Sequence, residues 1–149
     1  MRFVTRANVH IDRISTAWAI RRFVDPDATF LFVDRAEDLS QLDAIPFDMR
    51  GAELGHHHGR CTFEALIDKY ELRDPVLRRM GEIIRAIDMP LDGEPPAGYG
   101  WVASAFDDLR AIGLSDHERL VRGGVICVRM YRACAAERVS AAPRPPASD

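Results

Sequence analysis

Phe3-Val4-Thr5 and Phe30-Leu31-Phe32-Val33 are short runs of β-branched and aromatic residues, the composition typical of β-strands. Between them, residues 12–24 carry apolar side chains at helical spacing. The order predicts a strand-helix-strand unit. If the two strands pair in parallel, the loop over residues 6–12 lies at the carboxyl end of the first strand, where such sheets usually bind ligands.

The rest of the chain is predicted to be mostly helical. Short strands are expected at residues 47–49 and 52–54. Further helices are then predicted, capped by Thr62, Asp74 and Ser115 and running to about Glu71, Pro90 and Ala136, with another over residues 101–112. Residues 91–100 carry three proline-or-glycine clusters, which predict a loop.

These elements define an α+β fold: a small sheet with an N-terminal β-α-β unit, followed by a mostly helical C-terminal half. The 149 residues are 47% apolar and 29% charged, ordinary values for one globular domain that needs neither a metal nor disulfides to fold. We expect a single domain over residues 1–138. Residues 139–149, rich in alanine, proline and serine without periodicity, are predicted to form a disordered tail.

The charge balance and the cysteines narrow the class of protein. Twenty basic and 23 acidic residues give a net charge of −3, which disfavours nucleic acid as a partner of this chain alone. The three cysteines lack CxxC spacing, so a reducing compartment is expected. The N-terminus has no apolar signal core, and nowhere do 18 apolar residues run together. We therefore expect a cytoplasmic protein without a membrane partner.

The densest chemistry in the sequence lies at residues 56–64. Three adjacent histidines precede Cys61 and Glu64, so imidazoles, a thiol and a carboxylate fall within nine residues. These groups bind transition metals, and iron, manganese or zinc would suit the mixture. We predict His56, Glu64 and Asp88 as ligands, with His57 and Cys61 as alternates. The alternative is solvent-exposed histidines beside a buried Cys61.

The basic residues suggest an anion site beside this predicted metal site. Nineteen of the 20 are arginines, although codon usage explains most of that excess. Arg6, Arg13 and Arg60 flank the two loops described above, and arginine forks match tetrahedral oxyanions such as phosphate, sulfate or chromate. We predict that these three arginines bind an anionic ligand.

Several segments resemble the C-terminal domain of the chromate-resistance ChrB family, in consistent order over residues 3–135. They are Val4-Thr5-Arg6, Ile11-Asp12-Arg13-Ile14, the run from Trp18 to Pro26, Pro46-Phe47-Asp48, the run from Gly59 to Leu66, and Asp116-His117-Glu118. The resemblance implies a role in bacterial chromate resistance, a stress response. Longer members of the family are regarded as chromate-responsive regulators of an efflux pump and carry a further N-terminal region, so we expect no DNA-binding role to transfer to this chain.

This chain departs from the family pattern at two positions near the first helix. Thr16 stands where the resemblance leads us to expect a cysteine, and His10 stands where a lysine is often found. The loss of that thiol argues against a redox pairing with Cys61.

The leading hypothesis is a ChrB-type domain that binds a metal ion or an oxyanion in a cleft between the two loops, in chromate sensing or detoxification. One alternative is a metal-dependent redox or hydrolytic enzyme that uses the same cleft, with Asp12 as the candidate catalytic base. Another is a homodimer formed through the long C-terminal helix, with no ligand.

Overall fold

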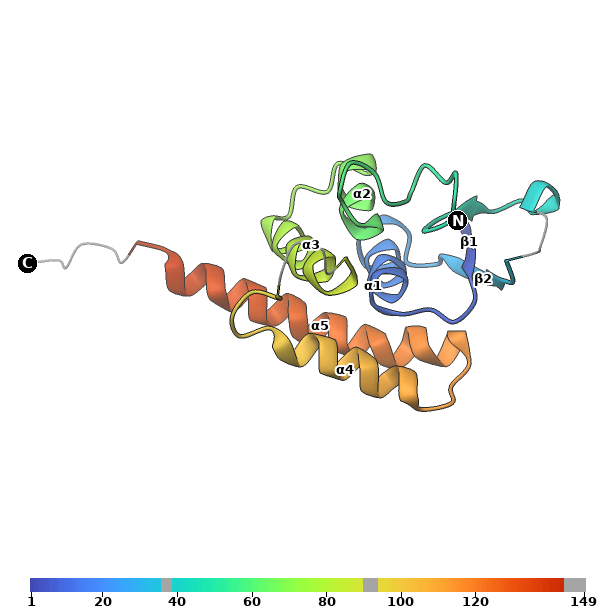
Figure 1. Ribbon diagram of the computed structural model, residues 1–149. Coiled ribbons are helices and arrows are strands. Elements are labelled where there is room, and N and C mark those ends of the chain that lie inside the picture. The colour runs from blue at the N-terminus through green and yellow to red at the C-terminus, as the bar shows by residue number, and fades with distance from the viewer. Residues whose placement is uncertain (36–38, 90–93, 144–149) are drawn as a thin grey trace, which may run out of the picture.

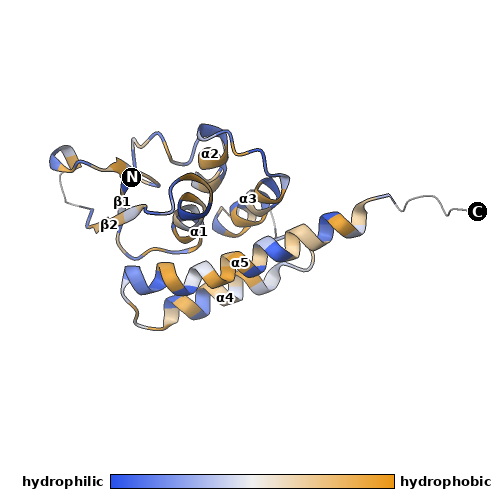
Figure 2. Cartoon of the chain, turned by 180° about the vertical axis from the view of Figure 1, so that it is seen from behind, coloured by the Kyte–Doolittle hydropathy of each residue, from blue (hydrophilic) through white to orange (hydrophobic). Residues whose placement is uncertain are grey.

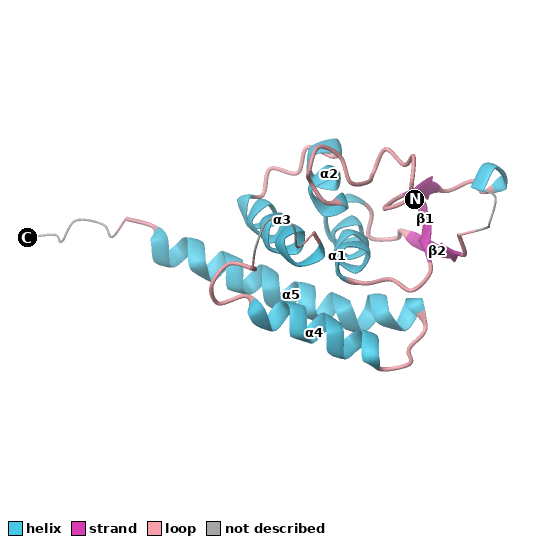
Figure 3. Ribbon diagram, in the orientation of Figure 1, coloured by secondary structure: helices cyan, strands magenta, loops and turns pink. Residues whose placement is uncertain are grey.

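The computed structural model describes residues 1–35, 39–89 and 94–143 and has the predicted α+β fold (Figure 1). A parallel sheet has the strand order β2-β1-β3, formed by β1 (Arg2–Arg6), β2 (Thr29–Val33) and β3 (Ile45–Pro46). The first helix, α1 (Ile11–Ala19), connects β1 to β2, which confirms the strand-helix-strand unit. Figure 3 shows that the strands gather at one end and that helices form the rest.

The predicted helix over residues 12–24 is confirmed, but it changes its geometry at the end. After α1 the chain continues as a π-helix, η1 (Ile20–Val24), and the N–H of Asp25 donates to the carbonyl of Ile20, five residues earlier. Asp25 itself has extended backbone, and Pro26 follows. A π-turn holds one residue more than an α-helical turn, and it is rare, occurring mostly as a single turn within a helix.

Residues 47–54 form a compact loop, so the prediction of strands at 47–49 and 52–54 was wrong. Strand β3 lies just before this segment, and Phe47 and Leu54 form only an isolated bridge. Two left-handed residues, Asp48 with φ 48° and Gly51 with φ 80°, bend the backbone between them. An extended strand cannot contain such residues.

Four longer helices follow the sheet, and a short 3-10 turn, η2 (Leu39–Gln41), precedes β3. Asp74 accepts a hydrogen bond from the Val76 N–H, and Ser115 forms a capping box with Glu118, so both predicted caps are confirmed. The helices are α2 (Thr62–Lys69), α3 (Pro75–Asp88), α4 (Gly100–Ala111) and α5 (Asp116–Ala141). Helix α5 extends past the predicted end and into the expected tail, whose residues 144–149 lie outside the described part of the chain.

Thr62 was wrongly predicted as a cap, because Cys61 occupies the N-cap position of α2. The Glu64 carboxylate accepts the Cys61 N–H at 3.0 Å and closes the first turn.

The predicted loop at residues 91–100 is described only from residue 94. Residues 94–99 contain no helix or strand, and Gly100 begins α4.

Helix α5 packs against α1, α3 and α4, so it connects the N-terminal β-α-β unit with the later helices (Figure 1). It approaches α1 closely at Gly123, where a Cβ atom would lie 2.4 Å from Cγ2 of Ile14. Figure 2 shows apolar and polar residues alternating along α5. In the described part of the chain, no helix is both long and apolar enough to cross a membrane.

Candidate functional site

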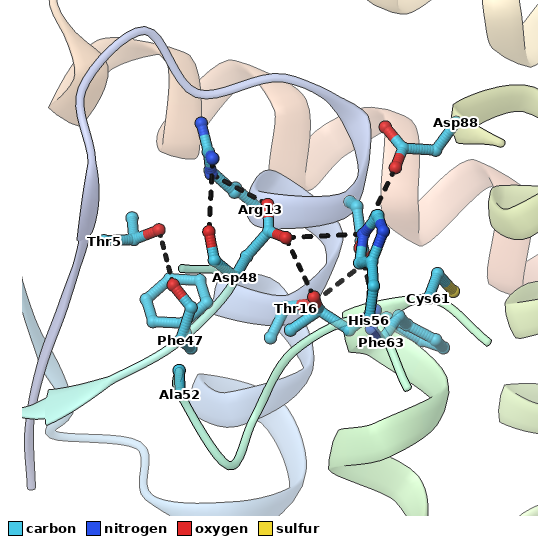
Figure 4. A network of polar contacts seen from close by, with 12 residues as sticks. Thr5, Arg13, Thr16, Phe47, Asp48, Ala52, His56, Cys61, Phe63 and Asp88 are labelled. Carbon is cyan, nitrogen blue, oxygen red and sulfur yellow. Dashed lines mark hydrogen bonds and ion pairs between the residues drawn. The ribbon is translucent and has the colours of Figure 1, made fainter. Parts of the chain in front are cut away.

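Three aspartates converge on His56 at the carboxyl-terminal side of the sheet (Figure 4). The Nε2 atom of His56 lies 3.0 Å from Asp12 Oδ2, 3.4 Å from Asp48 Oδ1 and 3.5 Å from Asp88 Oδ2. Together with His10 and Arg13, these residues line a cavity of about 230 Å³. We call these four residues, Asp12, Asp48, His56 and Asp88, the carboxylate–histidine cluster.

Asp12 is fixed by the start of α2. Its side chain is 2% exposed. One carboxylate oxygen accepts the Thr62 N–H at 2.8 Å, and the other accepts the Phe63 N–H at 2.9 Å. Backbone N–H groups in the first turn of a helix have no partner within that helix. Asp12 on α1 therefore caps α2, and it holds His56 with the same carboxylate.

Asp48 is held in the left-handed loop by contacts from both neighbouring helices. Its Oδ2 atom lies 2.8 Å from Arg13 Nε, and the Thr62 hydroxyl donates to its Oδ1 atom at 3.0 Å. Arg13 also donates to the Asp48 carbonyl at 3.2 Å. Sequence reasoning did not select Asp48 as a ligand, although it lies in the Pro46-Phe47-Asp48 segment of the family resemblance, which was the available signal.

The side chains of the cluster shift one another's pKa values. Burial, followed by the charge of Asp12, raises the pKa of Asp48, and the same causes together with Asp48 raise the pKa of Asp88 to about 6. The hydrogen bond to Asp12 raises the pKa of His56 to about 9 against its partial burial. A proton on His56 therefore offsets part of the carboxylate charge at neutral pH.

Three residues of this cluster could together hold a metal ion. Asp12, Asp48 and His56 each offer one ligand atom, and these atoms all lie within 4.8 Å of one another. Asp88, at the last turn of α3, lies against the same imidazole. The structure thus brings together two of the predicted metal ligands, His56 and Asp88, and adds Asp12 and Asp48 to them.

Glu64, predicted as a metal ligand together with His56 and Asp88, has other partners. Its Oε1 atom accepts from Arg85 at 3.1 Å and lies 3.8 Å from Arg60 Nε, while Oε2 accepts the Cys61 N–H. The side chain crosses α3 at Gly81, where a Cβ atom would lie 2.7 Å from Glu64 Cγ. Glu64 therefore joins α2 to α3.

The two alternate ligands, His57 and Cys61, also lie outside the cluster. His57 Nε2 lies 2.9 Å from the Glu53 carbonyl and 3.2 Å from the Ala52 carbonyl. Cys61 is fully buried, and burial raises the pKa of its thiol, so the sulfur stays protonated. Of the ligands predicted within residues 56–64, His56 lies in the cluster, and Glu64, His57 and Cys61 have other partners.

Two of the three predicted anion-binding arginines line one cavity. Arg6 and Arg13 border a space of about 380 Å³ at the carboxyl ends of β1 and β2, and Asn8 and Arg35 border it as well. Arg13 also lines the carboxylate–histidine cavity. Sequence reasoning missed Arg35, although its place just after a parallel strand could have indicated it.

Arg60, the third predicted anion ligand, lies elsewhere. It is paired with Asp68 and faces a separate cavity between α2 and α3, together with Arg78 and Arg85. That cavity also contains Glu64 and Glu82, whose carboxylates offset the positive charge.

Comparison with known proteins identifies the family. The model of the ChrB C-terminal domain matches residues 3–134, and the chain belongs to this family. Protein ChrB of Cupriavidus metallidurans is 41% identical over 90 residues, which cover 58% of this chain and 27% of that protein. The match thus spans about a quarter of the relative's length. No solved structure matches the chain. Family membership supports a role related to chromate resistance.

Proposed function

We propose that this domain binds a divalent transition-metal ion at Asp12, Asp48 and His56, with Asp88 completing the site, and that it acts in this form in chromate resistance. The observation that carries the proposal is the convergence of three carboxylates on one imidazole. Carboxylate and imidazole ligands suit iron, manganese and zinc.

The raised pKa values support the same proposal. Burial and neighbouring negative charge raise the pKa values of Asp48 and Asp88, and a bound cation would relieve this opposition to their ionisation. Binding would displace the proton from His56, so metal uptake should release protons and should strengthen as the pH rises toward 9.

The test is elemental analysis and calorimetry on protein purified without a tag. We expect about one Zn²⁺ or Mn²⁺ per chain, and at least a tenfold loss of affinity in Asp48→Asn and His56→Ala. His57→Ala is the matched control, because that imidazole lies in the same loop but bonds to backbone carbonyls. The proposal fails if His56→Ala and His57→Ala bind metal equally, or if the wild-type protein binds none.

A second candidate function is the binding of a tetrahedral oxyanion such as chromate in the cavity lined by Arg6, Arg13 and Arg35. Three guanidinium groups border this space, and Arg13 connects it to the carboxylate–histidine cluster. Titration with chromate and with sulfate should show binding that weakens at least fivefold in Arg35→Gln. Arg60→Gln is the control and should bind as the wild type does. If Arg35→Gln and Arg60→Gln changed the affinity equally, the oxyanion would not bind in this cavity.

The enzyme alternative uses the same groups differently. Asp12, its candidate base, already accepts a backbone N–H on each oxygen, which favours a capping and ligand-holding role over proton abstraction. If the domain is an enzyme, its reaction would therefore have to depend on a bound metal ion rather than on Asp12 as the base. Stoichiometric iron or manganese together with a measurable reaction would support that alternative.

A further inference from the structure

A second surface feature, on the other side of α1, has no part in the metal proposal. A groove of about 280 Å³ runs between the end of the first helix and the start of α5. Trp18, half-buried, forms one wall, and it is braced by Phe23 and Tyr131 at ring distances of 5.7 Å and 6.0 Å. The other lining residues are Ala17, Arg21, Arg22, Leu120 and Val121.

An apolar stripe on α5 continues from this groove. Val121, Val125 and Val128 are 68%, 69% and 38% exposed. Their spacing of four and three residues places them on one face of the helix. Branched apolar side chains that line up beside a groove, on a helix whose other face is buried, indicate an interaction surface.

Arginines border the groove and stripe on both sides. Arg21 and Arg22 line the groove, while Arg122 and Arg129 lie on α5 at positions about a quarter-turn from the valines. Arg21 donates to the Ala28 carbonyl, and Arg129 lies over the Trp101 ring at 4.2 Å, but among the described residues none of these four guanidinium groups forms an ion pair with a carboxylate. Glu118, one turn before Arg122, is hydrogen-bonded to Ser115, and the charge of Arg122 contributes to lowering its pKa.

We propose that this surface docks an acidic amphipathic helix of a partner protein. Its aliphatic side chains would cover the valine stripe and contact Trp18, and its carboxylates would pair with the flanking arginines. The charge pattern selects this occupant, because a second copy would bring arginines against arginines. Nucleic acid would leave the valines facing phosphates, and the concave wall at Trp18 fits a protein side chain better than a flat lipid surface.

The experiment uses the whole chain and a designed peptide of about 18 residues with leucines at i, i+4, i+7 and i+11 and glutamates on the flanks. Binding is followed by fluorescence anisotropy of the labelled peptide. We expect saturable, salt-sensitive binding, at least tenfold tighter than that of the same peptide with lysine in place of glutamate. Val125→Glu and Arg122→Glu should each weaken it at least tenfold.

Val139→Glu is the matched control, because Val139 lies on the same helix, is 77% exposed and stands beyond the groove. This variant should bind as the wild type does, and thermal melts should show that all variants are folded. Three results would overturn the proposal: no binding of the glutamate peptide, equal losses in Val125→Glu and Val139→Glu, or equal binding of the lysine peptide.

Two further measurements test whether the surface instead binds a second copy of this chain or a membrane. If sedimentation shows a dimer that Val125→Glu dissociates, the surface is a contact between copies of this chain and the proposal is wrong. If the protein binds vesicles of phosphatidylserine and phosphatidylcholine through this face more tightly than the peptide, the surface is a membrane site and the proposal is equally wrong. The proposal is supported if the protein is a monomer, does not bind the vesicles and binds the glutamate peptide.

Discussion

Asp12 shows how one side chain can serve two elements. Its two oxygens accept N–H groups at the start of α2, and one of them also contacts His56. Sequence reasoning placed Asp12 in the ligand loop but treated it as a catalytic candidate, because a contact between residues about 50 positions apart leaves no local pattern. Asp74 and Ser115 cap their own helices, and local spacing was enough to predict them.

We predict that Asp12→Ala destabilises the protein strongly. The change leaves two backbone N–H groups without their partner in a buried position, at a cost of about 2–4 kcal/mol. Asp12→Asn should cost less, because its amide oxygen still accepts one of them. Urea unfolding at pH 7 measures both values. Asp108→Ala, at an exposed position, is the control, and a loss no larger than that of the control would refute the capping role.

We also predict that Asp88→Asn stabilises the metal-free protein above pH 6. Burial and the neighbouring carboxylates raise the pKa of Asp88 to about 6, so its ionisation is less favourable in the folded than in the unfolded chain. This penalty is absent below about pH 4 and complete above about pH 6. Thermal melts in EDTA at pH 3.5 and 7.5 measure the difference, which should appear only at the higher pH. A less stable variant at pH 7.5 would contradict the prediction, and saturating Zn²⁺ should reverse the order.

At the scale of the elements, apolar periodicity predicted α1, α3, α4 and α5 because their buried faces repeat along the chain. The apolar face of α3 is largely buried, including Leu77, Met80 and Ile84. The loop at residues 47–54 was mistaken for strands, because its apolar residues Phe47 and Leu54 are buried without extended pairing. The left-handed backbone at Asp48 depends on contacts with Arg13 and Thr62, which lie far away in sequence.

Two adjacent glycines of α5 provide a matched pair for the α1–α5 contact. Gly123→Ala should cost about 1–3 kcal/mol, because its Cβ would lie 2.4 Å from Cγ2 of the buried Ile14. Gly124→Ala should be neutral or stabilising by up to about 1 kcal/mol, because its nearest neighbour is Trp18 at 3.7 Å and alanine favours a helix. Chemical denaturation measures both. Equal effects would show that α5 can shift away from α1.

At the scale of the whole molecule, the candidate site connects three parts of the chain. Asp12 begins α1, Asp48 and His56 come from the segment between β3 and α2, and Asp88 ends α3. The sequence predicted most of the elements, and it named two of the four residues, His56 and Asp88, as ligands. The pairing of His56 with Asp12 and Asp48, rather than with Glu64, depends on how α2 docks on α1. Periodicity along the chain does not encode that docking.

A bound metal should therefore stabilise the whole domain. At a free Zn²⁺ concentration 100 times the dissociation constant, the gain is about 2.7 kcal/mol, or roughly 5–10 °C in melting temperature for a domain of this size. Differential scanning fluorimetry with and without Zn²⁺ measures the shift. His56→Ala should abolish it, while His57→Ala should retain it. An unchanged melting temperature in the wild-type protein at saturating metal would contradict the prediction.

The double duty of Asp12 has a consequence for cells that depend on this domain. Replacing Asp12 removes a carboxylate from the candidate site and also removes the hydrogen bonds that join α1 to α2. A larger fraction of the chains would therefore be unfolded and accessible to proteases. If the domain acts in chromate resistance as proposed, that resistance would then fall because less of the protein is present. Asp88, which caps no helix, separates the two effects: its loss should leave the amount of protein intact while the site changes.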